Sequence, residues 1–218
     1  AGLRAQDGKD VPVWKKMHYL SEAEMKLPHD NLKSFTPTDP PEHPVRMVGE
    51  YEHMQSVLVR YPFGIPTSLI AEMSQHCGVT TIVANAGEQN TVSGIYQGSG
   101  VNMDNVDFLI APSDSYWTRD YGPWFVIDGN GSFGVCDFPY NRPRPNDNNI
   151  PVAVAAHLGI DLYGMPLEHT GGNWMCSGNS QGASTDLIWE ENPSLSHQDI
   201  QDLVDDYLGV EQYHVLPD

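Results

Sequence analysis

The stretch "SDSYWTRDYGPWFVIDG" covers residues 113–129 and carries the clearest structural signals of the chain. Gly122-Pro123 ends any helix that precedes it. The apolar run "PWFVI" (123–127) and the run "SFGVCDF" (132–138) flank the turn sequence "DGNG" (128–131). Two β-rich runs joined by such a turn predict a hairpin.

The same stretch places Trp117, Arg119, Asp120 and Trp124 within eight positions. A carboxylate accepts two parallel N–H bonds from a guanidinium, and an aromatic face adds cation–π attraction. The sequence therefore predicts a loop in which Asp120 and Trp117 grip a flat cation. The alternative is that Asp120 pairs with Arg119 at a surface turn, and composition alone leaves both open.

Strand and helix signals alternate on both sides of the hairpin. Ser196 is a plausible helix cap with Asp199 three residues later, and Gly209 closes the apolar stripe between them. The other patterns predict strands at 56–61, 79–84, 106–111, 185–190 and 210–218, helices at 66–78, 88–97 and 151–159, and a loop at 141–149. This mixture indicates an α/β or α+β fold. Residues 1–46 are polar and rich in proline, which predicts an irregular N-terminal arm.

The composition limits the classes of function. The chain has 218 residues, of which 39% are hydrophobic, enough for a sizeable core. Its net charge of -18 disfavours binding of nucleic acid through phosphates and would attract a cationic substrate. A solubilising acidic surface explains this charge equally well. The sequence has no run of 18 apolar residues, so no membrane span is expected.

The cysteines and a sequon bear on the cellular compartment. Cys77, Cys136 and Cys176 lack metal-ligand spacing and are expected to be buried free thiols, although one could pair with a cysteine outside the chain. The sequence Asn130-Gly131-Ser132 is both an N-glycosylation sequon and part of the predicted turn. A first residue other than Met suits a processed or trimmed N-terminus. We therefore expect a secreted or extracellular protein.

Two more stretches could carry chemistry. In "YNRPRPND" (140–147), Arg142 and Arg144 would point to the same side of an extended segment and could clamp a carboxylate or phosphate. A solvated loop that balances nearby acids is the alternative. In "LEHTGGNWMCSGNSQG" (167–182), Gly171-Gly172 would let the backbone approach a ligand closely. His169 could be an acid/base or a metal ligand, although a lone histidine is more often structural.

Three of these motifs carry a resemblance. "SYWTRDYGPWFV", "DFPYNRPRPND" and "HTGGNWM…STDLIWEENPSLS" resemble the bacterial-type peptidylarginine deiminases, which are relatives of the agmatine deiminases in the guanidine-modifying superfamily. The similarity runs from about Val45 to the end of the chain. It implies an α/β-propeller of the pentein type, with five ββαβ blades around a substrate channel. About the first half of such a propeller would lie in this chain.

The resemblance also implies roles for single residues. Asp120 matches the catalytic carboxylate that holds the substrate guanidinium, and Trp117 matches an aromatic wall of the site. Arg142 and Arg144 match the pair that grips the α-carboxylate of a C-terminal arginine. Ser177 departs from the family, which usually carries an acidic residue there. No metal or other cofactor is expected for this chemistry.

The family's His-x-Asp pair and nucleophilic cysteine would follow Asp218 and are absent from this sequence. We therefore expect residues 47–218 to be the N-terminal portion of a catalytic domain that a companion chain completes as a heteromer. That companion would be either a second product of the same proteolytically processed precursor or a separate subunit. The assembly would convert arginine, as a peptide or protein substrate, to citrulline and ammonia through a cysteine thiouronium intermediate.

Two other functions stay open. The chain could be a non-catalytic guanidinium-binding or assembly subunit derived from a deiminase. It could also belong to an agmatine deiminase, which the arginine pair disfavours because agmatine has no carboxylate to clamp.

Overall fold

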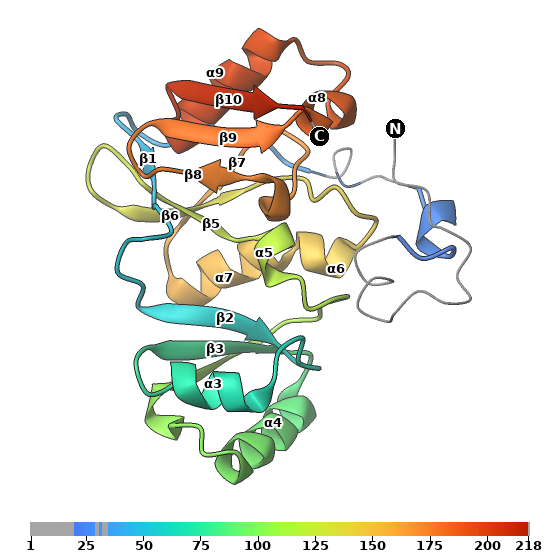
Figure 1. Cartoon of the computed structure of the whole chain (residues 1–218), viewed down its shortest axis with the longest axis vertical. Helices are drawn as coiled ribbons and strands as arrows, with labels where there is room; N and C mark the ends of the chain where they lie inside the picture. Colours follow the sequence, from blue (N-terminus) through green and yellow to red (C-terminus); the bar gives the residue numbers. More distant parts are fainter. Residues whose placement is uncertain (1–19, 29–30, 32–34, 218) are drawn as a thin grey trace.

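The computed structural model describes residues 20–28, 31 and 35–217. In this part of the chain, strands form three sheets that lie one after another along the long axis of the molecule (Figure 1). Helices pack between and beside the sheets, so the α/β class expected from the sequence is confirmed. Within the predicted irregular arm (1–46), residues 1–19, 29–30 and 32–34 lie outside the described residues.

The first sheet is wholly parallel, in the order β2-β3-β4. Its elements are β2 (Ser56–Arg60), α3 (Thr67–Met73), β3 (Gly78–Val83), α4 (Ala86–Gly98), η2 (Met103–Asn105) and β4 (Val106–Ile110). Asn85 caps α4 by accepting the N–H groups of Gly87 and Glu88. Because the connections between parallel strands need crossovers, both helices cover this sheet and bury Ile70 and Tyr96 against it.

The second sheet has the order β1-β5-β6-β7. Its elements are β1 (Arg46–Met47), β5 (Trp124–Ile127), β6 (Phe133–Asp137), α6 (Pro145–Asn148), α7 (Ile150–Leu158) and β7 (Asp161–Gly164). The predicted hairpin is confirmed, because β5 and β6 pair antiparallel around a turn in which Gly131 has a φ of +81°. After α7 the chain returns as β7, parallel to β6.

The third sheet repeats this plan. Its elements are η3 (Gly171–Asn173), β8 (Met175–Cys176), β9 (Gln181–Thr185), α8 (Leu187–Glu191), α9 (His197–Leu208) and β10 (Gln212–Leu216). β8 and β9 are antiparallel, and β10 returns parallel to β9 after the helices. The second and third sheets are thus both ββαβ units, a repetition that the sequence pattern shows only as a loose spacing.

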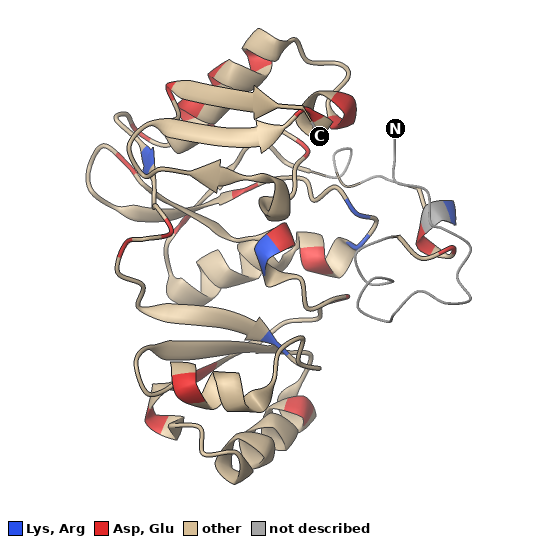
Figure 2. Cartoon of the chain, viewed as in Figure 1, with Lys and Arg blue, Asp and Glu red and all other residues tan. Residues whose placement is uncertain are grey.

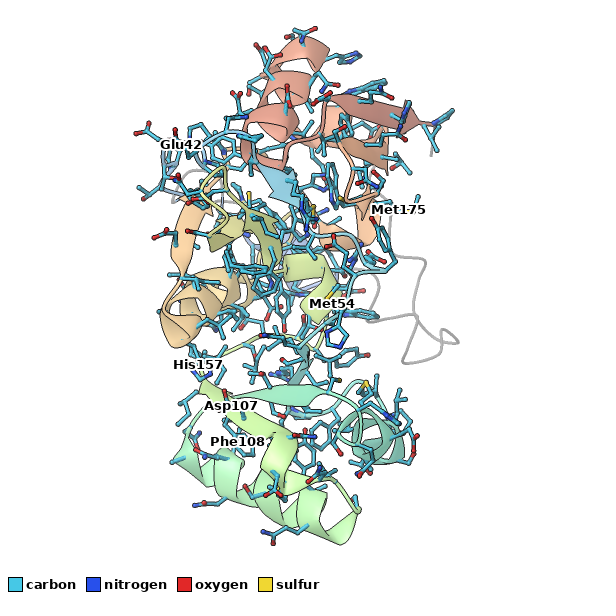
Figure 3. The ribbon with its side chains drawn as sticks, turned by 90° about the vertical axis from the view of Figure 1, so that its left-hand side faces the viewer. Glu42, Met54, Asp107, Phe108, His157 and Met175 are labelled. Atoms are coloured by element: carbon cyan, nitrogen blue, oxygen red, sulfur yellow. The ribbon has the colours of Figure 1, made fainter. Side chains whose placement is uncertain are left out.

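The two units share one core. Trp124 and Phe138 of the second unit and Trp174 of the third are almost fully buried in a single cluster. The indole of Trp124 stacks on that of Trp174 with ring centroids 5.2 Å apart. Helix α9 adds Ile200 and the other residues of its apolar stripe, as its sequence predicts. The first unit joins through a third cluster and through His157 of α7, whose Nε2 lies 2.6 Å from Asp107 Oδ2 of β4 (Figure 3).

Two elements differ from the sequence prediction. Residues 185–190 were expected to be a strand but mostly form α8, and the strand lies just before it as β9. The β9 sequence "QGAST" has few β-branched residues, so its conformation comes from pairing with β8 and β10 rather than from propensity. Residues 141–149, expected to be a loop, include the one-turn helix α6, which begins at Pro145.

The expected burial of the cysteines is only partly correct. Cys136 is buried, whereas Cys77 and Cys176 are half-buried, and none of the three is bonded to another cysteine. Among the described residues, no helix combines the length and apolar character that crossing a membrane requires.

Two glycines at helix ends differ in how closely other parts of the chain approach them. Gly159 ends α7 and Gly209 ends α9, with nearly equal left-handed φ values of +66° and +65°. A Cβ on Gly159 would meet open space, but one on Gly209 would overlap the backbone of Val45. We expect Gly159→Ala to lower the free energy of unfolding by about 1–2 kcal/mol, the cost of the left-handed backbone. Gly209→Ala should cost at least twice as much, measured by denaturant unfolding; equal losses would contradict the close contact.

Candidate functional site

Asp120 lies on a one-turn helix, α5 (Thr118–Tyr121), rather than in a loop. The carbonyl of Trp117 accepts the N–H of Asp120 at 2.9 Å, which closes the turn. Gly122, with a φ of +85°, ends the helix as Gly122-Pro123 predicts. The Asp120 side chain is half-buried and Trp117 is partly exposed.

Arg119 fastens α5 to the Gly-Gly-Asn segment. Its Nε donates to the carbonyl of Gly171 at 2.9 Å and its Nη2 to the carbonyl of Trp174 at 2.7 Å. The same guanidinium forms an ion pair with Glu50, with N and O 2.5 Å apart. Arg119 therefore joins the second and third units, which is a larger role than the surface-turn partner considered for it.

The glycine pair makes this contact possible. A Cβ on Gly171 would overlap the carbonyl of Arg119, and a Cβ on Gly172 would lie 2.5 Å from Asp120 Oδ1. The sequence predicted that these glycines let backbone approach a ligand. In the structure they let η3 approach α5, which places Asp120 directly against Gly172.

The predicted arginine pair does not run along an extended segment. The chain bends there, and the N–H of Arg144 donates to the carbonyl of Arg142 at 2.7 Å. Arg144 is 9% exposed and its Nε donates to Glu24 Oε1 at 2.7 Å, whereas Arg142 is half-buried. The two side chains thus differ in burial, and the extended geometry expected for this segment is wrong.

The charges of the candidate residues nevertheless act on one group, the phenol of Tyr140. In Figure 2 the basic positions, in blue, include one on α5 and others on the segment that leads into α6. Burial raises the pKa of this phenol above its ordinary value. The negative charge of Asp120 adds to this shift, and the positive charges of Arg144 and Arg142 oppose it. The structure therefore places the charges of Asp120 and of both arginines within electrostatic reach of the same phenol.

Sequence reasoning missed the group that holds the two loops together. Asp147 is fully buried and its carboxylate accepts the N–H of Asp114 and both the N–H and Oγ–H of Ser115. Asp114 in turn accepts the N–H of Asn146 at 2.9 Å. This network fixes the start of the Trp117 segment relative to the arginine segment. The only signal for it in the sequence is the acidic residue within a turn-rich stretch.

His169 takes the structural role. It is fully buried among Trp124, Phe138 and Trp174, with ring centroids 5.2 to 6.2 Å away. Its Nδ1 accepts the N–H of Thr170 at 2.8 Å, and its Nε2 has no partner among the described residues. Burial lowers the pKa of this imidazole to about 4, so the ring is neutral near pH 7.

A second buried acid lies beside the arginine segment. Glu191 of α8 accepts the Nδ2–H of Asn141 at 2.6 Å, while its Oε2 and the Oδ1 of Asn141 are buried without a partner in the described structure. Burial raises the pKa of Glu191 to about 7, with a smaller contribution from the charge of Glu168 and against the Asn141 hydrogen bond and the charge of Arg142, which both lower it. Protonation of Glu191 would supply the donor that two buried acceptors lack.

The remaining predicted groups are peripheral. Ser177 Oγ accepts the N–H groups of Asn179 and Gln181, so it closes the turn before β9. Burial raises the pKa of the Cys176 thiol, which disfavours the thiolate. Trp117 lines a cavity of about 220 Å³ together with residues of β2 and the segment that follows it, and Asp120 does not line it.

The fold matches that of known deiminases. Solved structures of agmatine deiminase from Enterococcus faecalis and from C. jejuni superpose with TM-scores of 0.67 and 0.65, at 23% and 16% identity. The match covers 80% and 79% of this chain and 53% and 55% of those chains.

The family described as Porphyromonas-type peptidyl-arginine deiminase matches residues 46–218. The chain belongs to this family, as its motifs predict. A protein of Shewanella sp. (strain W3-18-1), named "Putative agmatine deiminase", is 28% identical over 135 residues, which are 56% of this chain and 36% of that protein. A protein of the same name from Marinomonas sp. (strain MWYL1) is 30% identical over 128 residues, 53% of this chain and 35% of its own length. The matched segments thus cover about a third of the length of these relatives.

The site generates a prediction about pH. The folded-state pKa of Glu191 is raised from 4.5 to about 7, so unfolding releases a proton and the free energy of unfolding falls as pH rises through that range. Glu191→Gln cannot ionise. We expect its stability relative to the parent protein to increase from pH 5 to pH 8, on the order of 2 kcal/mol.

The measurement is denaturant unfolding at several pH values. Asp137, whose pKa burial raises to about 7, and His169 also make stability depend on pH. Both groups are present in variant and parent, so their contributions cancel in the difference between the two free energies of unfolding. Glu190→Gln makes the same chemical change at an exposed position of the same helix and is the matched control. A pH-independent difference for Glu191→Gln would show that Glu191 is ionised throughout.

Proposed function

We propose that this chain supplies the guanidinium-binding part of a deiminase that hydrolyses peptidyl-arginine to citrulline and ammonia. The observation that carries the proposal is the placement of Asp120. Its carboxylate is held against Gly172 by the Arg119 contacts, on a helical turn that begins at Trp117, and within electrostatic reach of the phenol on which Arg142 and Arg144 also act.

In this reaction a cysteine thiolate attacks the guanidinium carbon, ammonia leaves, and water hydrolyses the thiouronium. Asp120 would accept two N–H bonds of the substrate cation and keep its charge in place during the attack. Trp117 would provide an aromatic face for the planar group. Arg142, with Arg144 if that side chain is released, would bind a terminal carboxylate.

The nucleophile would come from elsewhere. Burial raises the pKa values of Cys136 and Cys176, so neither thiol is activated within the described structure. We propose that the cysteine, histidine and second aspartate are supplied by residues outside these 218, on a companion chain. The two ββαβ units and the parallel first unit support an arrangement as blades of a pentein-type propeller, which further blades would complete. Asn130 is exposed in its turn, which supports secretion as the compartment.

Agmatine deimination is the second candidate. The names of the relatives favour it as much as they favour peptidyl-arginine. One feature of the site also favours it, because Arg144 is already neutralised by Glu24, and a substrate without a carboxylate needs no arginine clamp. The third candidate is a binding subunit without activity, for which Ser177 at the acidic position of the family is the supporting feature.

The test of the binding role is Asp120→Asn. The amide loses the charge and one acceptor of the bidentate grip, and leaving a cation unpaired at a buried site costs about 3–5 kcal/mol. We expect at least a hundredfold loss of affinity for an arginine peptide, measured by the fluorescence of Trp117 and its neighbours, and a matching loss of citrulline formation in the assembled protein.

Asp104→Asn is the control, because Asp104 is exposed in the first unit and the chemical change is the same. Binding within threefold of the parent in Asp120→Asn would refute the assignment. Binding that falls in Asp120→Asn, without citrulline formation by the parent assembly, would favour the non-catalytic subunit.

The companion chain is tested by native mass spectrometry of the protein purified from its source. We expect the chain to travel with a polypeptide that carries a His-x-Asp pair and a cysteine near its C-terminal end, and to separate from it in denaturant. Citrulline formation by the 218-residue chain as a folded monomer would overturn this part of the proposal.

A further inference from the structure

An ion pair connects the arginine segment to the N-terminal part of the chain. Arg144 Nε and Glu24 Oε1 are 2.7 Å apart, and the two side chains are only 10% and 21% exposed. The pair of Arg119 and Glu50, by comparison, is 49% and 66% exposed. Screening by water is weaker for the less exposed pair, so Glu24 is a strong partner for Arg144.

Glu24 is ionised in this contact. Burial opposes its ionisation, but the hydrogen bonds from Arg144 and from Ser21 outweigh that cost and lower its pKa. The same bond raises the pKa of the Arg144 guanidinium against the opposing effect of burial. Near neutral pH the contact is therefore a carboxylate on a guanidinium, the same chemical arrangement that a substrate carboxylate would form there.

The segment that carries Glu24 is held by polar contacts. The N–H of Ser21 donates to Glu24 Oε2 at 2.7 Å, and the N–H of Glu24 donates to Ser21 Oγ at 3.2 Å. These two bonds shape the turn η1 (Glu24–Lys26). Further along, Asn31 Nδ2 donates to the carbonyls of Tyr140 and Arg142. Leu27 is 53% exposed and does not anchor the segment in the core. Contacts of this kind can exchange with those of a ligand without unfolding the body of the chain.

Few other cations could hold a substrate carboxylate. All five lysines lie within the first 33 residues, and from residue 47 onward the only basic residues are Arg60, Arg119, Arg142 and Arg144. Arg60 bonds to the hydroxyl and carbonyl of Ser113, and Arg119 bonds to two carbonyls. Of these four arginines, Arg142 and Arg144 remain to bind a substrate carboxylate, and Arg144 is already hydrogen-bonded to Glu24.

We propose that Glu24 is a specificity-determining residue, an internal carboxylate that competes with a substrate carboxylate for Arg144. This inference rests on the proposed guanidinium site at Asp120 and adds a selectivity to it. With Glu24 in place, the site favours guanidinium compounds that have no free carboxylate, such as an internal arginine. A compound with a free α-carboxylate binds at the cost of displacing Glu24.

The test compares two ligands on the 218-residue chain. N-acetyl-arginine has a free carboxylate, whereas N-acetyl-argininamide carries the same guanidinium without it. In Glu24→Gln, N-acetyl-arginine should bind about tenfold more tightly, because one charge-assisted competitor is removed, while the affinity for the amide stays the same. Glu22→Gln, at an exposed neighbouring position, should change neither affinity.

The double variant Glu24→Gln with Arg144→Gln should lose the gain for N-acetyl-arginine. An equal gain for both ligands would mean that the segment blocks the site sterically, and no gain would mean that the ion pair does not compete. Either result overturns the proposal. If neither ligand binds to any variant, the assignment of the guanidinium site at Asp120 is wrong. A second measurement, which does not need that site, then tests whether Glu24 competes with a free carboxylate for Arg144.

The second measurement is the rate of cleavage by a lysine-specific protease. A lysine-specific protease can cut only within the first 33 residues, so cleavage after the exposed Lys26 reports the release of the Glu24 segment. In the parent and in Glu22→Gln, N-acetylglycine should accelerate this cleavage severalfold, whereas its neutral counterpart N-acetylglycinamide should not. Glu24→Gln should be cut rapidly with or without either compound. Equal rates with the two compounds in the parent would overturn the proposal.

Discussion

The contact between Arg119 and the Gly171–Asn173 turn is the constraint on which the candidate site depends. One guanidinium donates to the carbonyls of Gly171 and Trp174, and the absence of side chains on Gly171 and Gly172 lets α5 come close enough for both bonds. The contact joins two units that also share an apolar core, and apolar packing has little directional preference. The hydrogen bonds of Arg119 fix the orientation of α5 relative to this turn. They thereby set the position of Asp120, which is the residue after Arg119.

A second constraint comes from the other side of the site. Asp147 accepts three hydrogen bonds from Asp114 and Ser115, which join the segment that leads into α5 to the segment that carries the arginines. A buried carboxylate is stable only when its oxygens are satisfied in this way. The site is therefore built at the meeting point of two rigid polar networks.

The distribution of charge explains why so acidic a chain needs few cations. Arg60, Arg119 and Arg144 each donate to carbonyls or to a carboxylate of another segment. Arg144 with Glu24 and Arg142 near Glu191 follow the same rule, although their segment resembles a substrate clamp. In the structure, Arg144 forms an ion pair with Glu24, and the positive charge of Arg142 lowers the pKa of Glu191.

The sequence by itself determined the local features of this protein. Ser196, Asp199 and Gly209 fix the ends of α9, the DGNG turn fixes the β5–β6 hairpin, and the motif around Trp117 and Asp120 identifies the family. These succeed because caps, turns and short motifs act between residues that are close along the chain. The predicted strand at 185–190 failed, because "QGAST" becomes β9 only by pairing with two other strands.

The tertiary structure alone decided the repetition of the ββαβ unit, the convergence of Asp120, Arg142 and Arg144 on Tyr140, and the pairing of Glu24 with Arg144. Glu24 and Arg144 are 120 residues apart in the chain. Spacing along a sequence carries no information about such a pair. Its formation depends on where two whole segments come to rest, and its strength depends on the burial that only the packed structure provides.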